Sequence, residues 1–286
     1  MNGIVIVDKP SGWTSQDVTA RLRRVFNTRR IGHGGTLDPM ATGVLPVFVG
    51  RATRGVEFFE HAEKTYETVL RLGITTDTED ITGTVLTEQD AFVTGAMLEE
   101  VLPRFRGEIL QIPPMYSALK VNGQKLYDLA RKGKEVERKP RPVTIHELTL
   151  LGMETEGIRL RVRCSKGTYI RTLCKDIGEA LGCGGCMAAL RRVQAGEYTI
   201  NGAVPLAQLL EAENPERFLR PVDSMFLSVP TVELTVNQEK RCRNGNSFTV
   251  TIADGTYRAY SQNGEFLMLA KVESGVMSTI KSFFEV

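Results

Sequence analysis

The chain has 286 residues, of which 36 are lysine or arginine and 34 are aspartate or glutamate, so its net charge is +2. Apolar residues make up 42% and charged residues 24%, a globular composition that excludes a disordered or fibrous protein. At roughly 150 residues per domain, this length predicts about two domains. Apolar runs are too short for a membrane helix or for a signal peptide at the N-terminus, so we expect a cytoplasmic protein.

The small net charge hides a strong pattern along the sequence. Residues 1–56 carry 8 basic and 3 acidic side chains, residues 57–100 carry 2 and 11, and residues 104–175 carry 16 and 7. Basic segments can attract polyanions such as nucleic acid, although neighbouring blocks can also neutralise one another on a folded surface. Charge alone leaves these two interpretations open.

Cofactor and metal motifs are missing from the sequence. Five cysteines and three histidines are too few for a disulfide scaffold or a histidine-rich metal cluster. Cys183-Gly-Gly-Cys186 lacks a partner motif, so packed thiols beside a glycine turn are the favoured interpretation. Phosphate-binding and dinucleotide-binding glycine motifs, GxSxG and HExxH are also absent, so we expect no cofactor and no metal.

The first third of the chain predicts short strands alternating with helices. Strands are expected at Gly3–Asp8, Val44–Val49 and Tyr66–Leu72. Thr14 is a good N-cap for a helix that carries apolar residues at helical spacing through Phe26. A second helix is expected at Thr53–His61. Glycine-rich Gly32–Gly35 and polar Thr75–Gly83 are expected to be loops.

The middle of the chain continues this mixed pattern. One helix is expected to begin at Thr94. Further helices are expected at Leu126–Leu129, Thr168–Leu181 and Leu206–Leu210. The expected strands are Val143–Leu151, Ile158–Cys164 and Val193–Ile200, the first two as an antiparallel pair. Ile112–Tyr116 should be extended, because each proline bars its predecessor from helix.

After Pro221 the sequence becomes β-rich. Strands are predicted at Val232–Val236, Ser247–Ile252, Tyr257–Tyr260 and Phe266–Val272. The Asn-Gly, Asp-Gly and Asn-Gly dipeptides between them predict hairpins. A domain boundary near Ser228–Pro230 therefore divides the chain into residues 1–229 and a small module of residues 230–286.

The densest group of chemically useful residues is Gly32-His33-Gly-Gly-Thr-Leu-Asp38-Pro39-Met-Ala-Thr42-Gly43. Glycine lets a ligand approach the backbone closely, and proline restricts the loop that carries the carboxylate of Asp38. Such an aspartate can serve as nucleophile or general base, but Asp-Pro is also a common turn starter. The pattern alone favours the turn.

Several ordered motifs resemble those of the bacterial tRNA pseudouridine-55 synthase (TruB) family. Besides the Asp38 segment they are Val7–Ser15, Lys64–Glu67, Gly73–Asp80, Pro113–Gly123, Leu126–Gly133, Ser165–Leu173 and Leu190–Val193. The resemblance covers nearly the whole chain. It implies a mixed α+β fold with a largely antiparallel sheet flanked by helices, a catalytic domain of residues 1–229 and a PUA-like RNA-binding domain of residues 230–286.

The resemblance also implies the reaction and the roles of individual residues. Asp38 would be the catalytic aspartate of an isomerase that breaks the C1′–N1 bond of uridine 55 in the tRNA T loop and rejoins the base through C5. Tyr66 would stack on the base, and Arg171 would pair with Asp38 and be held by Asp80. Substrate contacts are implied for His33, Tyr169, Leu190 and Lys9. Without the resemblance, Tyr66 is an ordinary strand aromatic and Arg171 a solvated helix residue.

The implied partner is the T arm of tRNA, bound by a monomer without membrane or metal. The target uridine must be flipped out of the folded arm, and His33 could stack in the vacated space. Basic stretches at Arg21–Arg30 and Lys120–Arg141 would contact phosphates, the second as an RNA-gripping insertion at about residues 120–142. The alternative is a non-catalytic RNA-binding or RNA-chaperone protein. A sugar-cleaving hydrolase is disfavoured because it needs two acids and the best loop holds one.

Overall fold

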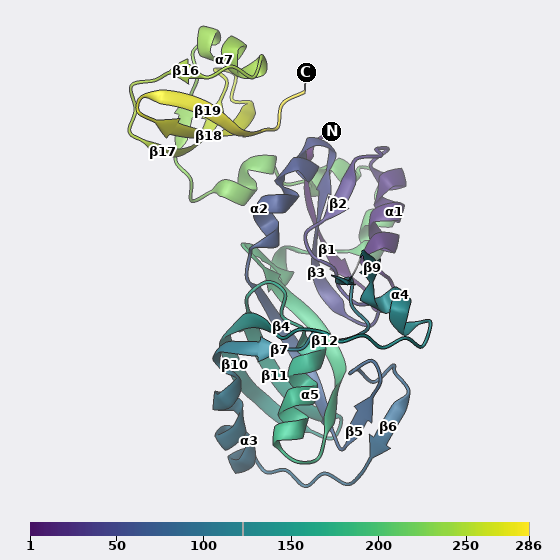
Figure 1. Cartoon of the computed structure of the whole chain (residues 1–286). Coiled ribbons are helices and arrows are strands. Elements are labelled where there is room, and N and C mark those ends of the chain that lie inside the picture. Colours follow the sequence, from purple (N-terminus) through teal and green to yellow (C-terminus); the bar gives the residue numbers. More distant parts are fainter. Residues whose placement is uncertain (122, 286) are drawn as a thin grey trace. The chain divides into compact units, whose positions relative to one another are not determined.

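The computed structural model describes residues 1–121 and 123–285, and the chain divides into two compact units. The first unit contains Met1–Pro39, Val44–Glu60 and Glu197–Val286, and the second contains Met40–Gly43 and His61–Gly196. Both combine helices with strands, and the strands pair mostly in antiparallel fashion (Figure 1). The predicted α+β class with a largely antiparallel sheet is confirmed.

In the first unit, the N-terminal strand β1 (Gly3–Lys9) is apolar and almost completely buried. It pairs in parallel with β14 (Val204–Pro205), so two strands far apart in the sequence are neighbours in one sheet. Helix α1 (Ser15–Val25) begins at Thr14, whose hydroxyl accepts a hydrogen bond from the Asp17 backbone N–H in a capping box. Val18 and Leu22 form its buried face, while its arginines point outward.

The remaining elements of this part of the first unit are short. They are β2 (Ile31–His33), β3 (Thr42–Val49, whose first two residues belong to the second unit), the 3₁₀ turn η1 (Gly50–Gly55), α2 (Val56–Glu60), β13 (Tyr198–Thr199), η3 (Ile200–Gly202), α6 (Leu206–Leu210), η4 (Pro215–Phe218) and η5 (Val222–Phe226). The expected loop at Gly32–Gly35 is partly wrong, because Gly32 and His33 pair with Phe48 and Val47. Glycine excludes regular helix there but not an edge strand.

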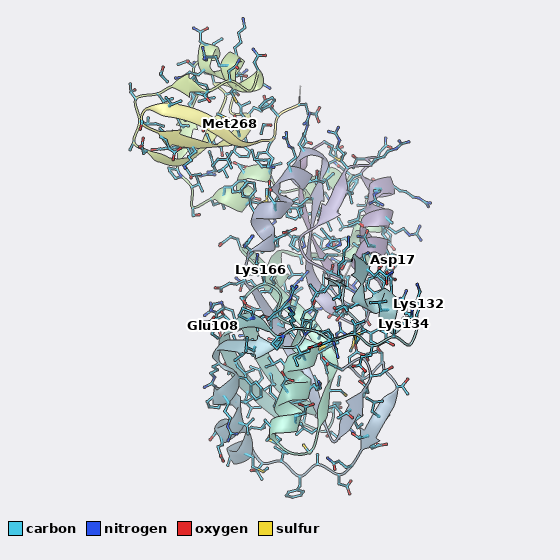
Figure 2. The ribbon with its side chains drawn as sticks, in the orientation of Figure 1. Asp17, Glu108, Lys132, Lys134, Lys166 and Met268 are labelled. Carbon is cyan, nitrogen blue, oxygen red and sulfur yellow. The ribbon has the colours of Figure 1, made fainter. Side chains whose placement is uncertain are left out.

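The C-terminal module has its own sheet, ordered β15-β17-β18-β19-β16, and its own apolar cluster. Its elements are β15 (Thr231–Glu233), α7 (Val236–Arg243), β16 (Phe248–Thr249), β17 (Gly255–Tyr260), β18 (Phe266–Glu273) and β19 (Val276–Ser282). Met268, labelled in Figure 2, lies in that cluster. The boundary at residue 229 stays a prediction, since compactness groups this module with the first unit.

The predicted hairpins of this module are confirmed only in part. β17 and β18 do form a hairpin around Asn263-Gly264. Asn244-Gly245 instead ends α7, with Asn244 as its C-cap and Gly245 at a φ of +74°. Asp254-Gly255 leads into β17, of which Gly255 is the first residue, but β16 pairs with β19 rather than with β17. A helix C-terminus and a tight hairpin both require a positive φ, so the dipeptide alone does not distinguish them.

The second unit is built on an antiparallel sheet ordered β12-β4-β11-β10-β7. Its strands are β4 (Lys64–Leu72), β7 (Gly107–Gln111), β10 (Arg141–Glu154), β11 (Gly157–Cys164) and β12 (Gly185–Ala195). The strand expected at Val193–Ile200 is therefore shifted, because β12 begins at Gly185 and ends in a turn at Gly196. Helix α5 (Ile170–Ala180) packs on β12 and β4 (Figure 1).

Two small hairpins and two further helices complete the second unit. They are β5 (Ile74–Thr76) with β6 (Val85–Glu88), β8 (Lys120–Val121) with β9 (Gln124–Lys125), α3 (Gly95–Val101) with the 3₁₀ turn η2 (Leu102–Phe105), and α4 (Leu126–Ala130). The expected loop at Thr75–Gly83 thus includes the end of β5. Thr94 caps α3 as predicted.

Candidate active site

The loop that carries Asp38 is anchored on both sides of that residue. On its N-terminal side, the Leu37 backbone N–H donates to the Ser15 hydroxyl at 2.9 Å, and that hydroxyl lies 3.2 Å from the Leu37 carbonyl. On its C-terminal side, the Pro39 carbonyl accepts the Gly12 backbone N–H at 2.8 Å. Asp38 itself is half-buried. Its carboxylate is therefore carried by a short backbone segment with little freedom.

Lys9 contributes a third anchor to the same loop. This side chain is completely buried at the end of β1. Its ammonium group donates to the Trp13 carbonyl at 2.6 Å, the Pro10 carbonyl at 2.9 Å and the Pro39 carbonyl at 3.3 Å. A buried charge needs such partners, and here they tie β1 and the turn before α1 to the residue after Asp38. Contact between Lys9 and substrate stays a prediction.

His33 lies at the end of β2, five residues before Asp38, and is half-buried. The next residue, Gly34, donates its backbone N–H to the Pro46 carbonyl at 2.9 Å. A Cβ atom at Gly34 would lie 2.5 Å from the Phe59 ring, so only glycine allows this packing. The chain between His33 and Asp38 is therefore short and starts from a fixed strand.

Beyond Asp38 the chain enters the second unit and begins β3. Thr42 and Gly43 pair in parallel with Arg191 and Arg192 of β12. The Arg191 guanidinium also donates to the Thr42 hydroxyl at 3.2 Å. Gly43 has a φ of +100°, and a Cβ there would lie 2.2 Å from the Arg192 carbonyl, so any other residue would disrupt this pairing.

Tyr66 and Leu190 come from neighbouring strands and share one face of the second unit's sheet. Tyr66 on β4 is opposite Arg192 on β12, and Thr68 is opposite Leu190. Residues opposite each other, and residues two apart along a strand, point to the same side. The Thr68 hydroxyl lies 3.8 Å from the Cys174 thiol of α5, so this is the face that α5 covers. Tyr66 is half-buried and Leu190 is buried.

Arg171, in the first turn of α5, is held in the interior of the second unit. Its guanidinium donates to the Thr78 carbonyl at 3.0 Å and to the Tyr116 carbonyl at 2.9 Å. Its Nε lies 3.9 Å from Oδ2 of Asp80, and both side chains are nearly fully buried. The expected contact between Asp80 and Arg171 is confirmed, and the reading of Arg171 as a solvated helix residue is wrong.

Tyr169 stands immediately before α5 and is half-buried. Its backbone makes two hydrogen bonds with the side chain of Gln111, a residue that the sequence analysis did not single out. Gln111 occupies a buried position in the alternating strand β7, where Ile109 is partly buried and Leu110 is exposed. A polar residue at an inward-facing strand position is the feature that could have revealed Gln111 as important, because buried polar side chains are almost always hydrogen-bonded.

Most basic side chains of the two segments are exposed, whereas Lys125 and Arg138 are partly buried. The arginines of the α1 region that point to solvent are Arg21, Arg23, Arg24, Arg29 and Arg30. Lys132 and Lys134 follow α4 and are also exposed (Figure 2). Arg138 is mostly buried and donates to the Pro113 carbonyl at 3.2 Å, so it serves the fold of the segment. Asn122, which belongs to the expected insertion and to the Pro113–Gly123 motif, lies outside the described residues.

No group of three histidine, cysteine, aspartate or glutamate side chains within residues 1–121 and 123–285 is arranged to hold a metal ion. Burial raises the pKa of the Cys174 thiol to about 12 and that of the Cys164 thiol to about 11. These thiols are protonated at neutral pH and are poor nucleophiles. In the same described part of the chain, no helix has the length and apolar character to cross a membrane.

Comparison with known families identifies the family of this chain. The N-terminal domain of the TruB family pseudouridylate synthases matches residues 23–170, and the C-terminal domain of tRNA pseudouridylate synthase B matches residues 171–227. The chain belongs to the TruB family. The resemblance of the ordered motifs is thereby confirmed, and membership makes the chain an isomerase that forms pseudouridine in tRNA.

TruB relatives match along most of this chain. A protein named tRNA pseudouridine synthase B from Clostridium kluyveri is 41% identical over 289 residues, which cover 99% of this chain and 100% of that protein. A protein of the same name from Francisella philomiragia is 44% identical and covers 100% of this chain and 95% of its own length. One from Ralstonia pickettii is 47% identical over 88% of this chain and 81% of that protein.

Solved structures agree with the TruB fold. A chain of a Cbf5-Nop10-Gar1 complex superposes with a TM-score of 0.74 at 25% identity, covering 99% of this chain and 85% of that chain. A chain of an H/ACA RNP bound to a substrate RNA containing 2′-deoxyuridine has the same TM-score and the same coverages at 24% identity. This second similarity concerns the fold alone.

Proposed function

We propose that this protein converts uridine 55 in the T loop of tRNA to pseudouridine, with Asp38 as the essential carboxylate. The observation that carries the proposal is the anchored loop around Asp38, which falls inside the segment matched by the TruB N-terminal domain. A carboxylate that acts at one carbon of a sugar must be held in place, and the bonds at Leu37 and Pro39 supply that restraint.

The reaction is an isomerisation and needs no net oxidant or reductant. The bond between C1′ and N1 breaks, the uracil turns, and a bond forms between C1′ and C5. N1 gains a proton, and the hydrogen on C5 leaves to a base and then to solvent. Asp38 can act by stabilising an oxocarbenium-like state, by covalent attack or by taking a sugar proton.

The other site residues receive roles around that carboxylate. Tyr66 stacks on the base and can assist proton transfer, and Tyr169 and Leu190 line the base pocket. Arg171 pairs with Asp38 and holds its carboxylate in place. The uridine is flipped out of the T arm to reach these groups, and His33 stacks in the space that it leaves. Lys9 acts mainly by holding the loop, given its buried ammonium group.

RNA binding is assigned to exposed basic segments and to the C-terminal module. The arginines of the α1 region and the lysines that follow α4 contact tRNA phosphates. Residues 1–229 form the catalytic domain, with an RNA-gripping insertion at about residues 120–142, and residues 230–286 form a PUA-like RNA-binding domain. We further propose that the protein acts as a monomer in the cytoplasm, without a metal ion.

The test is release of tritium from an unmodified tRNA transcript labelled at C5 of its uridines. Isomerisation makes C5 the glycosidic carbon, so its tritium must leave. The matched substrate control is a transcript with cytidine in place of uridine 55. We expect release from the first transcript and none from the second. Release from both transcripts would show that the modified uridine is not the one at position 55. Release from neither, with tRNA still bound, would support a non-catalytic RNA-binding protein.

Asp38→Asn tests the catalytic assignment in the same assay. The substitution preserves side-chain size but removes the negative charge, so turnover should fall below detection while the Kd for tRNA stays within about threefold. Sustained turnover by Asp38→Asn would refute the role of Asp38. Asp17→Asn is a matched control, because Asp17 caps α1 and is expected to affect only stability.

A further inference from the structure

Gln111 makes a two-point contact with the backbone of Tyr169. The Gln111 side-chain amide N–H donates to the Tyr169 carbonyl at 3.1 Å. In the other direction, the Tyr169 backbone N–H donates to the Gln111 side-chain oxygen at 3.0 Å. Gln111 is 1% exposed, so both bonds lie in the interior. The carboxamide therefore pairs with the Tyr169 peptide groups much as a neighbouring strand would.

The position of this contact is significant because α5 begins directly after Tyr169. The N-cap of α5 is Tyr169, whose side chain makes no capping hydrogen bond. The Tyr169 carbonyl already accepts the first hydrogen bond of the helix, from the Leu173 backbone N–H at 3.0 Å. Gln111 adds a second donor to that carbonyl and satisfies the preceding N–H group. A side chain from another element thus fixes the point at which α5 starts.

The segment that follows Gln111 makes a second connection to the same helix. The Tyr116 carbonyl accepts a hydrogen bond from the Arg171 guanidinium at 2.9 Å. Pro113 and Pro114 lie between these two connections and cannot donate a ladder hydrogen bond, so β7 ends at Gln111. Residues 111–116 therefore run beside the start of α5 and contact it at Tyr169 and at Arg171.

We propose that Gln111 is a positioning residue for the base pocket and acts by fixing the backbone of Tyr169. The inference rests on the proposed function, in which the Tyr169 ring contacts the flipped uracil. The ring direction of Tyr169 follows from its backbone, and that backbone has its two polar groups bound to one carboxamide. Loss of the carboxamide releases the ring without removing any group that touches RNA.

The first experiment compares the single-turnover rate of tritium release with the Kd for tRNA. Gln111→Met keeps the length of the side chain and removes both hydrogen bonds. We expect the rate to fall at least tenfold while the Kd changes by less than about twofold, because phosphate contacts dominate affinity. Gln89→Met is the control variant. Its amide donates to the Cys183 carbonyl at 2.8 Å, away from Tyr169, and its rate should equal that of the wild type.

Gln111→Glu gives a readout that general destabilisation would not produce. A neutral carboxyl group has one donor and one acceptor and restores both bonds, whereas the ionised form has no donor for the Tyr169 carbonyl. Relative to the wild type at the same pH, its rate should be low at pH 8 and should recover at least threefold at pH 5.5. This variant also tests the proposal if Gln111→Met does not fold.

A double-variant comparison tests the path through Tyr169. Tyr169→Ala removes the ring, so adding Gln111→Met to it should lower the rate by less than about twofold. If the rate losses of the two single variants multiply in the double variant, the proposal is overturned. A Gln111→Met rate within twofold of the wild type would also overturn it. Absence of tritium release by the wild type would instead refute the proposed function, and with it this inference.

Discussion

The guanidinium of Arg171 and the carboxylate of Asp80 face each other with 3.9 Å between Nε and Oδ2. Asp80 is held in turn by the hydroxyl of Thr78 at 2.9 Å and by the hydroxyl and backbone N–H of Thr82 at 2.6 and 3.0 Å. Two buried charges persist because their remaining donors and acceptors are satisfied. This pair is one of several contacts that join helix α5 to the loop after β5, and Arg171 is oriented by protein groups on several sides.

Arg171→Lys should lower activity although it keeps the charge. A lysine ammonium cannot reproduce the planar fork that reaches the Thr78 and Tyr116 carbonyls together. We expect at least a tenfold lower single-turnover rate and a loss of about 1–3 kcal/mol in the free energy of unfolding. Arg106→Lys is the control, since Arg106 donates twice to the Leu148 carbonyl and should affect stability alone. Equal activity losses in both variants would contradict a specific role for Arg171.

Lys9→Met should destabilise the protein through the loop of Asp38. The substitution removes the ammonium donor from the carbonyl groups of Pro10, Trp13 and Pro39, of which the Pro39 carbonyl keeps a second donor, the Gly12 backbone N–H. We expect the free energy of unfolding to fall by about 2–4 kcal/mol. Urea unfolding followed by fluorescence of Trp13 measures this change close to the loop. An unchanged unfolding midpoint would show that the carbonyl groups find water instead.

Neutralising Lys132, Lys134 and Lys139 together should weaken tRNA binding at low salt. All three are exposed in the segment after α4, and Lys132 and Lys134 are visible there in Figure 2. Each phosphate contact that is lost reduces the slope of log K against log salt by about 0.7–0.9. We therefore expect the slope of the triple glutamine variant to fall by about 2–3. Lys175→Gln is the control, because Glu79 and Glu179 already pair with Lys175. The same slope in the triple variant and the wild type would exclude phosphate contacts by these lysines.

Asp176→Asn should stabilise the protein at neutral pH and have little effect in acid. Burial, with smaller contributions from Glu179 and Glu79, raises the Asp176 pKa from 3.8 to about 6, against the opposing effect of Lys175. The folded state then binds more protons than the unfolded state between these values, so the contribution of Asp176 to stability falls as pH rises through that window. We expect Asp176→Asn to gain about 1–2 kcal/mol at pH 7.5, after allowance for solvent screening, and almost none at pH 3.5. Denaturant unfolding at both pH values measures the difference, and an equal gain at both would contradict the titration.

Local pattern was sufficient to predict most elements of the fold. The Thr14 cap, the alternation in Ile158–Cys164 and the apolar run of β1 specify their structures within a few residues of sequence. The start of β12 was missed because its pairing with β4 and β3 lies far away in the chain. Asn244-Gly245 was wrongly predicted to be a hairpin turn. Helix α7 is polar and short, so its helical periodicity is weak, whereas the Asn-Gly turn signal is strong.

The candidate site was predicted from ordered motifs rather than from the chemistry of single residues. Glycine and proline around Asp38 marked its loop, but that pattern alone favoured a turn, and the ordered motifs made Asp38 the catalytic candidate. Arg171 could not be recognised as buried from its own sequence neighbourhood, since its partners Thr78, Asp80 and Tyr116 come from two distant segments. The role of Gln111 depends on Tyr169, 58 residues later, and only the tertiary structure shows that contact.

The order of segments in the first unit has a consequence for how the protein forms on the ribosome. Val7 of β1 pairs with Val204, and Ile4 forms backbone hydrogen bonds with Arg220, so one edge of the N-terminal strand waits for about 200 further residues, while β3 on its other edge follows early in the chain. At about 5–20 residues per second this delay lasts about ten to forty seconds. The second unit is almost continuous in sequence, from His61 to Gly196, and can fold during that interval. One edge of an apolar strand is thus left without its partners early in synthesis, and a chaperone that shields extended apolar chain could cover that edge of β1 until β14 is made.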